Sequence, residues 1–337
     1  MNILLWHVHG SWTTAFVQGP HRYLLPTLPE RGPWGGGRPA AWDWPAGAVE
    51  IAPDELADAD VDVVVLQRPE ELELAERWLG RTLGRDVPVI YLEHNAPREH
   101  AATSRHPMAD RDDLTLVHVT HFNRLMWDAG STATTVVEHG IVDPGHRYTG
   151  ELAAAAVVVN EPLRRNRITG TDLLPAFART VPLDVFGMGT DGLGDALGVA
   201  EIQGRGDLPQ HRMHAEMARR RVYLHPLRWT SLGLSLLEAM HLGMPVVALA
   251  STEAGEAVPP GTGICSTDPD RLAQGLRELV ADPDRARATG AAARAHVLER
   301  YGLDRFLTCW DEVLAHATEG RRRQAPRPVA TATIGRS

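Results

Sequence analysis

Short apolar runs alternate with amphipathic stretches along the chain. Residues 61–67 read VDVVVLQ, a nearly continuous apolar run that predicts a strand buried on both faces of a sheet. Residues 69–83 follow with the spacing of an amphipathic helix. Further strands are predicted at 2–8, 87–93, 114–120 and 134–138, with a short helix at 123–129. This strand–helix order predicts a parallel sheet with helices on both faces.

A second unit of the same kind follows a stretch at 140–150 that contains Pro144 and several glycines, where we place a linker. The strands predicted in this unit are 154–160, 183–186, 200–203, 221–224 and 245–249. The helices predicted in it are 171–180, 234–242, 270–281, 286–300 and 303–317. The fold class predicted is α/β, with two doubly wound Rossmann-like domains that face a cleft. The predicted parts are a domain at 1–145, a domain at 151–302, a final helix at 303–318 and a disordered tail at 319–337.

Composition narrows the class of protein. The chain has 337 residues, of which 43% are hydrophobic and 23% charged, and its net charge is −9. These values predict a globular protein of two domains without a nucleic-acid partner. No apolar run reaches the roughly 18 residues of a membrane span, and the first residues do not resemble a signal peptide. The distant Cys265 and Cys309 favour reduced thiols and a cytoplasmic location.

The segment at 228–247, RWTSLGLSLLEAMHLGMPVV, holds the main candidate chemistry. Gly233 precedes a helix predicted from Leu234, so the backbone N–H groups of Ser231–Leu234 would be free to bind an anion such as a diphosphate. Glu238 lies about one turn into that helix, where its carboxylate could accept hydrogen bonds from two neighbouring hydroxyls of a ribose. The alternative is an ordinary helix with an exposed glutamate.

The run GLSLLEAMHLGMPVVA resembles the C-terminal signature of the family 4 glycosyltransferases, the "glycosyl transferases group 1" type with the GT-B fold. Residues 268–314 are similar to the closing helices of that family. The resemblance implies transfer of a hexosyl group from a UDP- or GDP-linked sugar to a hydroxyl acceptor, with retention of configuration. It implies no metal and no other cofactor. It also implies that 1–145 binds the acceptor, that 151–302 binds the nucleotide sugar, and that the helix at 303–318 returns toward the first domain.

One position departs from the family. Its members usually carry a first glutamate, which contacts the donor sugar, at the position of Thr230. A neutral, shorter threonine there favours a first alternative, a non-catalytic GT-B protein that binds nucleotides or serves as a scaffold. A second alternative is a sugar-nucleotide epimerase.

Other candidates come from the loops at strand ends. The loop at 160–172 offers Arg164, Arg165 and Arg167 to the phosphates, because guanidinium groups bind phosphate oxygens in pairs. By resemblance, Gly10 approaches the diphosphate and His94 faces the donor sugar. The predicted catalytic residues are His94, Arg164 and Glu238. The predicted donor-binding residues are Gly10, Arg164, Arg165, Arg167, Thr230, Ser231, Leu232, Gly233, Leu234 and Glu238.

The acceptor is expected near the first loop and the Trp-rich stretch at 32–45, which we predict to be a long loop. Ser11, Trp12, Trp42 and Trp44 are the candidates, since indole rings stack on sugar faces; the alternative is that some of these tryptophans belong to the core. His7 and His9 occupy alternate positions at the end of the first predicted strand, which could suggest a pair of metal ligands. No carboxylates accompany them in the sequence, so no metal site is predicted. The arginines at 321–327 leave a peripheral membrane contact open.

Overall fold

The computed structural model describes residues 1–39, 42–98 and 100–324. Within these residues, the N-terminal unit contains a seven-stranded sheet of order β3-β2-β1-β4-β5-β6-β7. Every neighbouring pair is parallel. The strands are β1 (Asn2–Leu5), β2 (Arg22–Pro26), β3 (Ala48–Ile51), β4 (Val63–Leu66), β5 (Val89–Glu93), β6 (Leu114–His118) and β7 (Ala133–Val136). The helices are α1 (Gly10–Phe16), η1 (Pro53–Glu55), α2 (Glu70–Leu79) and α3 (His121–Met126).

The C-terminal unit has a six-stranded parallel sheet in the described part of the chain, with order β10-β9-β8-β11-β12-β13. Its strands are β8 (Leu152–Val158), β9 (Leu183–Phe186), β10 (Ile202–Gly204), β11 (Arg220–His225), β12 (Val246–Leu249) and β13 (Gly263–Ser266). Its helices are α4 (Pro162–Arg165), η2 (Thr171–Leu173), α5 (Leu174–Ala178), α6 (Leu193–Leu197), α7 (Gln210–Met217), α8 (Leu234–His241), α9 (Ala254–Ala257), α10 (Pro269–Ala281) and α11 (Pro283–Arg300). The predicted fold class of two doubly wound α/β units is confirmed.

Several elements differ from the sequence expectation. Strands β2, β3 and β13 were not predicted, because each is short and lies beside glycine or proline. Strand β1 ends at Leu5, so His7 and His9 lie in the loop before α1 and not on a strand. Helix α7, which the sequence pattern also missed, supplies two side chains to the site described below.

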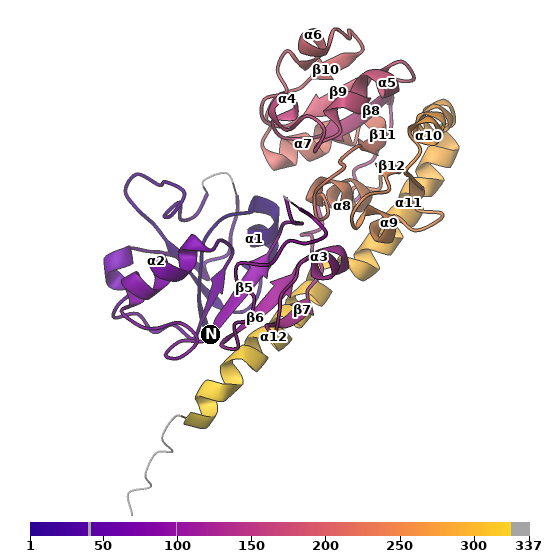
Figure 1. Cartoon of the computed structure of the whole chain (residues 1–337). Helices are drawn as coiled ribbons and strands as arrows, with labels where there is room; N and C mark the ends of the chain where they lie inside the picture. The colour runs from indigo at the N-terminus through magenta and orange to yellow at the C-terminus, as the bar shows by residue number, and fades with distance from the viewer. Residues whose placement is uncertain (40–41, 99, 325–337) are drawn as a thin grey trace, which may run out of the picture.

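Helix α12 (Leu303–Gln324) leaves the C-terminal unit and packs on the N-terminal sheet. Its Phe306, Trp310 and Leu314 are buried in one cluster with Trp12 and Phe16. Figure 1 shows α11 and α12 following one another from the upper unit to a position beneath the lower one. The helix includes Glu319–Gln324, where the sequence predicted the start of a tail; the remainder of that tail, 325–337, lies outside the described residues.

The chain crosses between the units at two adjacent places. The first crossing follows β7, and the second joins α11 to α12. The backbone N–H of Ile141 donates to the carbonyl of Tyr301 at 3.0 Å, which ties the two crossings together. Gly140 packs against Phe306 so closely that a Cβ at 140 would lie 2.3 Å from the Cβ of Phe306. The two crossings therefore form one narrow junction.

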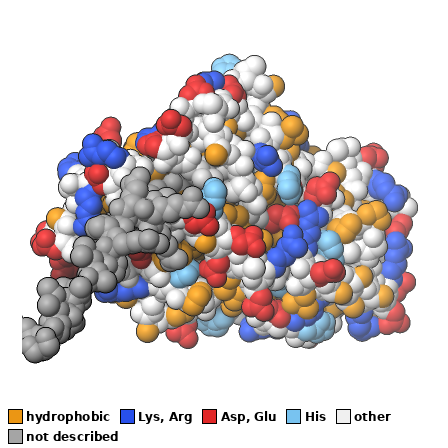
Figure 2. Space-filling view, turned by 90° about the horizontal axis from the view of Figure 1, so that it is seen from below, with side chains coloured by type: hydrophobic (Ala, Val, Ile, Leu, Met, Phe, Trp, Pro, Cys, Tyr) orange, Lys and Arg blue, Asp and Glu red, His pale blue; other side chains and the backbone are white. Residues whose placement is uncertain are grey.

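The surface of the described chain carries interspersed charges. Acidic and basic side chains lie among one another over the face drawn in Figure 2. Among the described residues, no helix combines the length and the apolar character needed to cross a bilayer.

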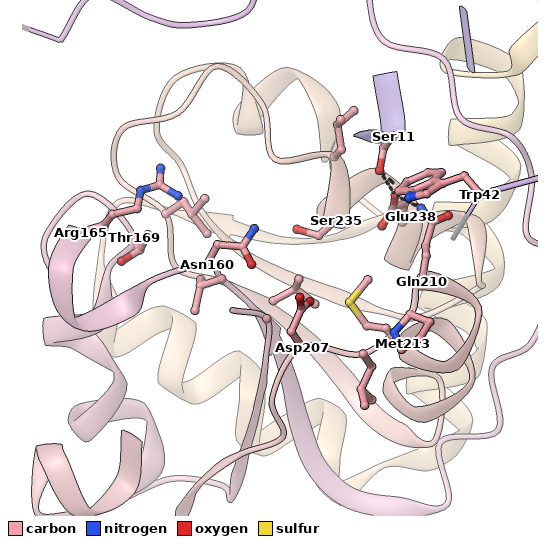
Figure 3. A pocket seen from close by; sticks show the side chains of 17 residues that line it. Ser11, Trp42, Asn160, Arg165, Thr169, Asp207, Gln210, Met213, Ser235 and Glu238 are labelled. Carbon is pink, nitrogen blue, oxygen red and sulfur yellow. Dashed lines mark hydrogen bonds between the residues drawn. The ribbon is translucent and has the colours of Figure 1, made fainter. Parts of the chain in front are cut away.

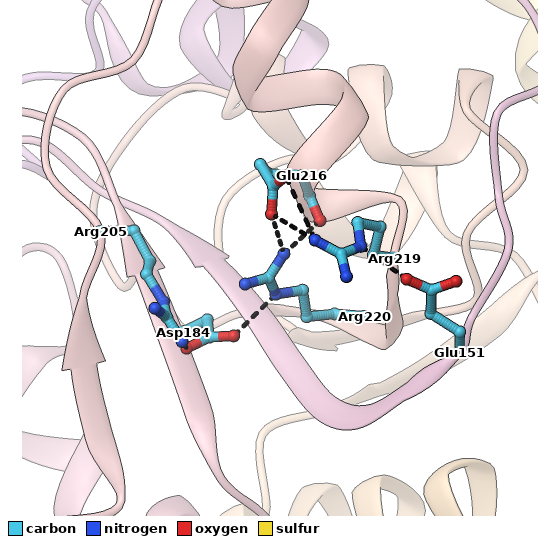
Figure 4. Close-up of polar contacts among 6 residues, drawn as sticks. All are labelled: Glu151, Asp184, Arg205, Glu216, Arg219 and Arg220. Atoms are coloured by element: carbon cyan, nitrogen blue, oxygen red, sulfur yellow. Dashed lines mark hydrogen bonds and ion pairs between the residues drawn. The ribbon is translucent and has the colours of Figure 1, made fainter.

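A buried ion network fixes helix α7 to the C-terminal sheet (Figure 4). Asp184 on β9 accepts hydrogen bonds from Arg220 on β11 and from Arg205, each at 2.7 Å. Arg220 also donates to Glu216 on α7 at 2.8 Å. Arg220 is 3% exposed and Asp184 is 6% exposed. Because both charges are buried away from water, each is stabilised by the other.

We expect Asp184→Ala to destabilise the protein by about 3 kcal/mol, because it leaves the buried Arg220 guanidinium short of a partner. The control is Glu151→Ala, which removes the exposed partner of Arg219 and should cost less than about 1 kcal/mol. Urea titrations of both variants measure the difference. Equal losses would contradict a structural role for the buried pair.

Candidate functional site

The Glu238 carboxylate joins the two units. Glu238 lies on α8 and is 3% exposed. Its Oε1 accepts hydrogen bonds from the Ser11 hydroxyl of α1 and from Gln210 Nε2 of α7, each at 2.9 Å (Figure 3). Its Oε2 lies 3.3 Å from Nε2 of His214, also on α7. The glutamate is therefore not exposed, and its oxygens are held by three side chains from two helices.

These contacts keep Glu238 ionised. Burial alone would raise the pKa of its carboxyl, but the hydrogen bonds from His214, Ser11 and Gln210 outweigh burial and hold the pKa below its usual value. Glu238 is thus a carboxylate at neutral pH. It can accept hydrogen bonds from ligand hydroxyls, but it has no proton to donate.

Glu238 forms one wall of a cavity of about 580 Å³, which we call the Glu238 cavity. Ser11 and Trp42 line it from the N-terminal unit, and Arg165 and Thr169 line it from the C-terminal unit. Figure 3 shows Arg165 and Glu238 at opposite ends. Arg165 is half-buried, and its guanidinium makes no hydrogen bond or ion pair with the residues that the structure describes. A cation without a partner among the described residues and a fixed carboxylate thus face one cavity.

The first turn of α8 opens toward the same cavity. No side chain caps this turn, and Leu234 and Ser235 line the cavity. Its N–H groups and the helix dipole favour an anion. Gly233, the residue before the helix, packs against His225, where a Cβ would lie 2.4 Å from the ring Cε1. A larger residue would displace the turn, so glycine is needed there for packing.

Ser231 and Leu232 do not line the Glu238 cavity, and both make structural contacts; Ser231 also lines the second cavity described below. The Ser231 hydroxyl donates to the carbonyl of His94 and accepts a hydrogen bond from Asn123 Nδ2 at 2.8 Å. Both partners belong to the N-terminal unit, so this serine holds the two units together. Leu232 is buried in the core of the C-terminal unit.

His94 lies behind His9. Its Nε2 is 2.9 Å from Gln67 Oε1, and its ring centroid is 4.0 Å from that of His9. Burial lowers the pKa of His94 well below its ordinary value, and the neighbouring His9 and His139 act in the same direction. Burial, with Arg68 and other neighbours, lowers the pKa of His9 to about 4. Both rings are therefore neutral at pH 7.

A second cavity of about 690 Å³, the Arg98 cavity, opens beside the first. His9 and Arg98 line it from the N-terminal unit; Arg164, Arg165 and Thr230 line it from the C-terminal unit. Arg165 therefore reaches both cavities. Thr230 faces this one, and its neutral side chain leaves the arginines without an added carboxylate.

The remaining predicted donor ligands are dispersed. Arg164 is exposed and forms an ion pair with Glu161. Arg167 is exposed, pairs with Asp172 at 3.0 Å and lines neither cavity. Gly10 begins α1 and packs against Trp42, whose Cζ2 would lie 3.0 Å from a Cβ at that position.

The four acceptor candidates divide into two pairs. Ser11 and Trp42 line the Glu238 cavity. Trp12 is 1% exposed and Trp44 is 3% exposed, and both belong to the N-terminal core. Trp12 and Trp44 are therefore core residues, which is the alternative that the sequence left open for some of the tryptophans.

Sequence reasoning missed Gln210, His214 and Arg98. Gln210 and His214 are one helical turn apart, which would have placed them on one face, but the short helix was not predicted. Arg98 follows the end of β5, the edge where parallel sheets bind ligands. In the part of the chain that the structure describes, no group of three or more His, Cys, Asp or Glu side chains is arranged to hold a metal ion.

Comparison with known proteins adds to this geometry. Residues 195–296 match the family model "Glycosyl transferases group 1". A GDP-mannose-dependent monoacylated alpha-(1-6)-phosphatidylinositol monomannoside mannosyltransferase of Corynebacterium glutamicum is 48% identical over 68 residues, which are 20% of this chain and 18% of the relative. A GDP-mannose-dependent alpha-(1-6)-phosphatidylinositol monomannoside mannosyltransferase of Mycolicibacterium smegmatis is 37% identical over 117 residues, 31% of this chain and 30% of the relative. The matches thus span less than a third of either relative.

Solved structures share the fold over nearly the whole chain. Sucrose-phosphate synthase from Thermosynechococcus elongatus has a TM-score of 0.66 at 15% identity and covers 96% of this chain and 98% of its own. HepE of Anabaena, solved in complex with UDP-glucose, has a TM-score of 0.65 at 14% identity, with coverage of 94% and 100%. These likenesses establish the two-domain fold. The resemblance to group 1 glycosyltransferases that the sequence indicated is confirmed by the family model and the relatives.

Buried histidines make stability fall in acid. Burial lowers the pKa of His118 to about 3, and neither ring nitrogen has a hydrogen-bond partner among the described residues. Between its unfolded pKa of about 6.5 and the folded value, the unfolded chain binds more protons. We expect His118→Leu to reduce the loss of stability below pH 6.5 by up to about 1.4 kcal/mol per pH unit.

The control for this prediction is His211→Leu at an exposed position of α7. Unfolding measured between pH 7.5 and 4.5 should give the same slope for this variant and the unmodified protein. A His118→Leu slope equal to both would show that His118 titrates normally in the folded state.

Proposed function

We propose that this chain, which carries the group 1 glycosyltransferase segment in its C-terminal unit, transfers a sugar from a nucleoside diphosphate sugar to a hydroxyl acceptor. The observation that supports this best is the Glu238 cavity, where a buried carboxylate and an unpaired arginine lie at opposite ends. A nucleoside diphosphate needs this pair of charges: an acceptor for its ribose hydroxyls and a cation for its phosphates.

In this proposal Glu238 binds the ribose. Two hydroxyl groups of the ribose replace Ser11 and Gln210 as the hydrogen-bond donors to the Glu238 carboxylate. His214 keeps its contact with the carboxylate. Because Glu238 is already ionised and oriented, ligand binding does not require its deprotonation or a new rotamer.

The diphosphate would lie between Arg165 and the first turn of α8. As the bond between sugar and phosphate breaks, negative charge develops on the leaving diphosphate. Arg165 and the N–H groups of that turn are already in place to stabilise it, and Arg164 lies in the adjoining Arg98 cavity. We propose a UDP- or GDP-linked donor, retention of configuration and no essential metal, with catalysis from positioning and charge stabilisation. His94 would support the sugar side through His9, which lines the adjoining cavity.

Thr230 favours a second candidate, a non-catalytic nucleotide-binding or scaffold protein, because it removes the carboxylate that the family places against the donor sugar. Incubation with UDP- and GDP-linked sugars and a broad acceptor panel separates the two functions. Turnover supports the transferase, whereas nucleotide binding without turnover supports the binding protein. An epimerase would convert the donor without any acceptor present.

We expect the chain to bind UDP, GDP or ADP in isothermal titration calorimetry, and Glu238→Ala to weaken that binding by roughly ten- to a hundred-fold through loss of charged hydrogen bonds. Glu201→Ala, at an exposed position of the same unit, is the control and should bind as the unmodified protein does. Glu238→Gln keeps the shape of the side chain but removes its charge. Weaker nucleotide binding by this variant would therefore not be due to misfolding. If none of the three nucleotides binds, the proposed function is wrong.

A further inference from the structure

Among the described residues that line the Arg98 cavity, arginines outnumber acidic residues. Arg98, Arg164 and Arg165 line it, and Glu161 is the acidic residue among its lining side chains. Glu161 is already paired with Arg164. Arg98 is exposed and, like Arg165, its guanidinium forms no hydrogen bond or ion pair with another described residue. Among the described residues, two cations without an ion-pair partner therefore face one cavity.

These cations lie near one another. Burial lowers the pKa of Arg165, and the charges of Arg164 and Arg98 lower it further. Like charges held together destabilise the empty site, and an anion bound between them removes that repulsion. Thr230 lies on the same wall and adds no negative charge.

The two cations come from different units. Arg165 lines both cavities, so a nucleoside diphosphate in the Glu238 cavity can use it. Of the two cavities, as the described residues line them, Arg98 lines the Arg98 cavity and not the Glu238 cavity. It lies on the N-terminal wall, four residues after His94 in the loop that follows β5. The donor phosphates therefore leave the charge of Arg98 unmatched, although it faces the space next to the transferred sugar.

We propose that the N-terminal wall of the Arg98 cavity, where Arg98 lies, is a subsite for a negatively charged acceptor, and that Arg98 binds a phosphate ester carried by the acceptor. This inference rests on the proposed function, because it places the molecule that receives the sugar beside the donor sugar, on the Arg98 side of the second cavity. Arg98 is a binding residue in this site. It fixes the phosphate so that a hydroxyl of the same molecule is directed toward the sugar of the donor.

The rim of the cavity indicates two sources for such a phosphate. Ile168 and Met188 line the cavity and are 43% and 48% exposed, and Leu163 on α4 is 51% exposed. Exposed apolar side chains beside a cationic pocket suit the phosphate headgroup of a lipid. A soluble sugar phosphate offers the same anion without the apolar part, so the chemistry common to both is the phosphate ester.

The test measures binding to the full chain saturated with whichever nucleoside diphosphate it binds. The probes are glucose, glucose 6-phosphate and soluble dihexanoyl phosphatidylinositol. We expect at least one phosphate-bearing probe to bind ten-fold or more tightly than glucose. Arg98→Ala should remove most of that preference, a loss of roughly ten- to a hundred-fold, and Arg98→Lys should restore part of it. Nucleotide affinity should stay unchanged in both variants.

The matched control is Arg77→Ala on α2, which removes an exposed arginine of the same unit outside either cavity and should change neither affinity. Preference for the lipid probe over glucose 6-phosphate, reduced by Ile168→Ser, identifies the lipid source, and the reverse preference identifies the soluble one. The inference is overturned, and the proposed function is not, if nucleotide binds but neither phosphate probe binds better than glucose. It is also overturned if Arg98→Ala weakens nucleotide binding instead, since Arg98 would then belong to the donor site. Failure of every nucleotide to bind overturns both.

Discussion

The buried carboxylate of Glu238 is the constraint on which the candidate site depends. An ionised carboxyl group is costly to remove from water unless donors replace the lost hydration. Here Ser11, Gln210 and His214 provide them, and they come from two helices in different units. The position of Glu238 is therefore correct only when α1, α7 and α8 are all correctly placed, and the cavity takes its shape from the same contacts.

The position of α7 has its own cause, remote from the cavity. The Asp184, Arg220 and Glu216 network holds the C-terminal end of this helix to the central strands. Gln210 and His214 extend from the other part of the helix toward Glu238. The Asp184 network thus holds one end of α7 to the sheet. By doing so it orients Gln210 and His214 toward Glu238.

The sequence predicted the fold class, and it selected a segment that lines the Glu238 cavity, because both depend on local patterns. The buried strands are apolar runs, and the segment from Gly233 to Pro245 combines a turn, a helix start and a strand. The contacts of Glu238 could not be predicted in this way. Gln210 is 28 positions from Glu238 and Ser11 is 227 positions away, and only the folded chain brings them together. The tryptophans illustrate the same limit, since Trp42 faces the cavity whereas Trp44, two residues later, is in the core.

The junction formed by Ile141 and Tyr301 has a consequence for how the units move. Because a backbone hydrogen bond ties the two crossings together and Gly140 packs on Phe306 beside them, we expect any relative rotation of the units to take place about this one junction. The Ser11–Glu238 and Ser231–His94 hydrogen bonds both cross between the units, so a rotation that separates them breaks both contacts. Separation of the units and exposure of the Glu238 carboxylate would then be a single event, and the rotation angle at the junction would control access to the Glu238 cavity.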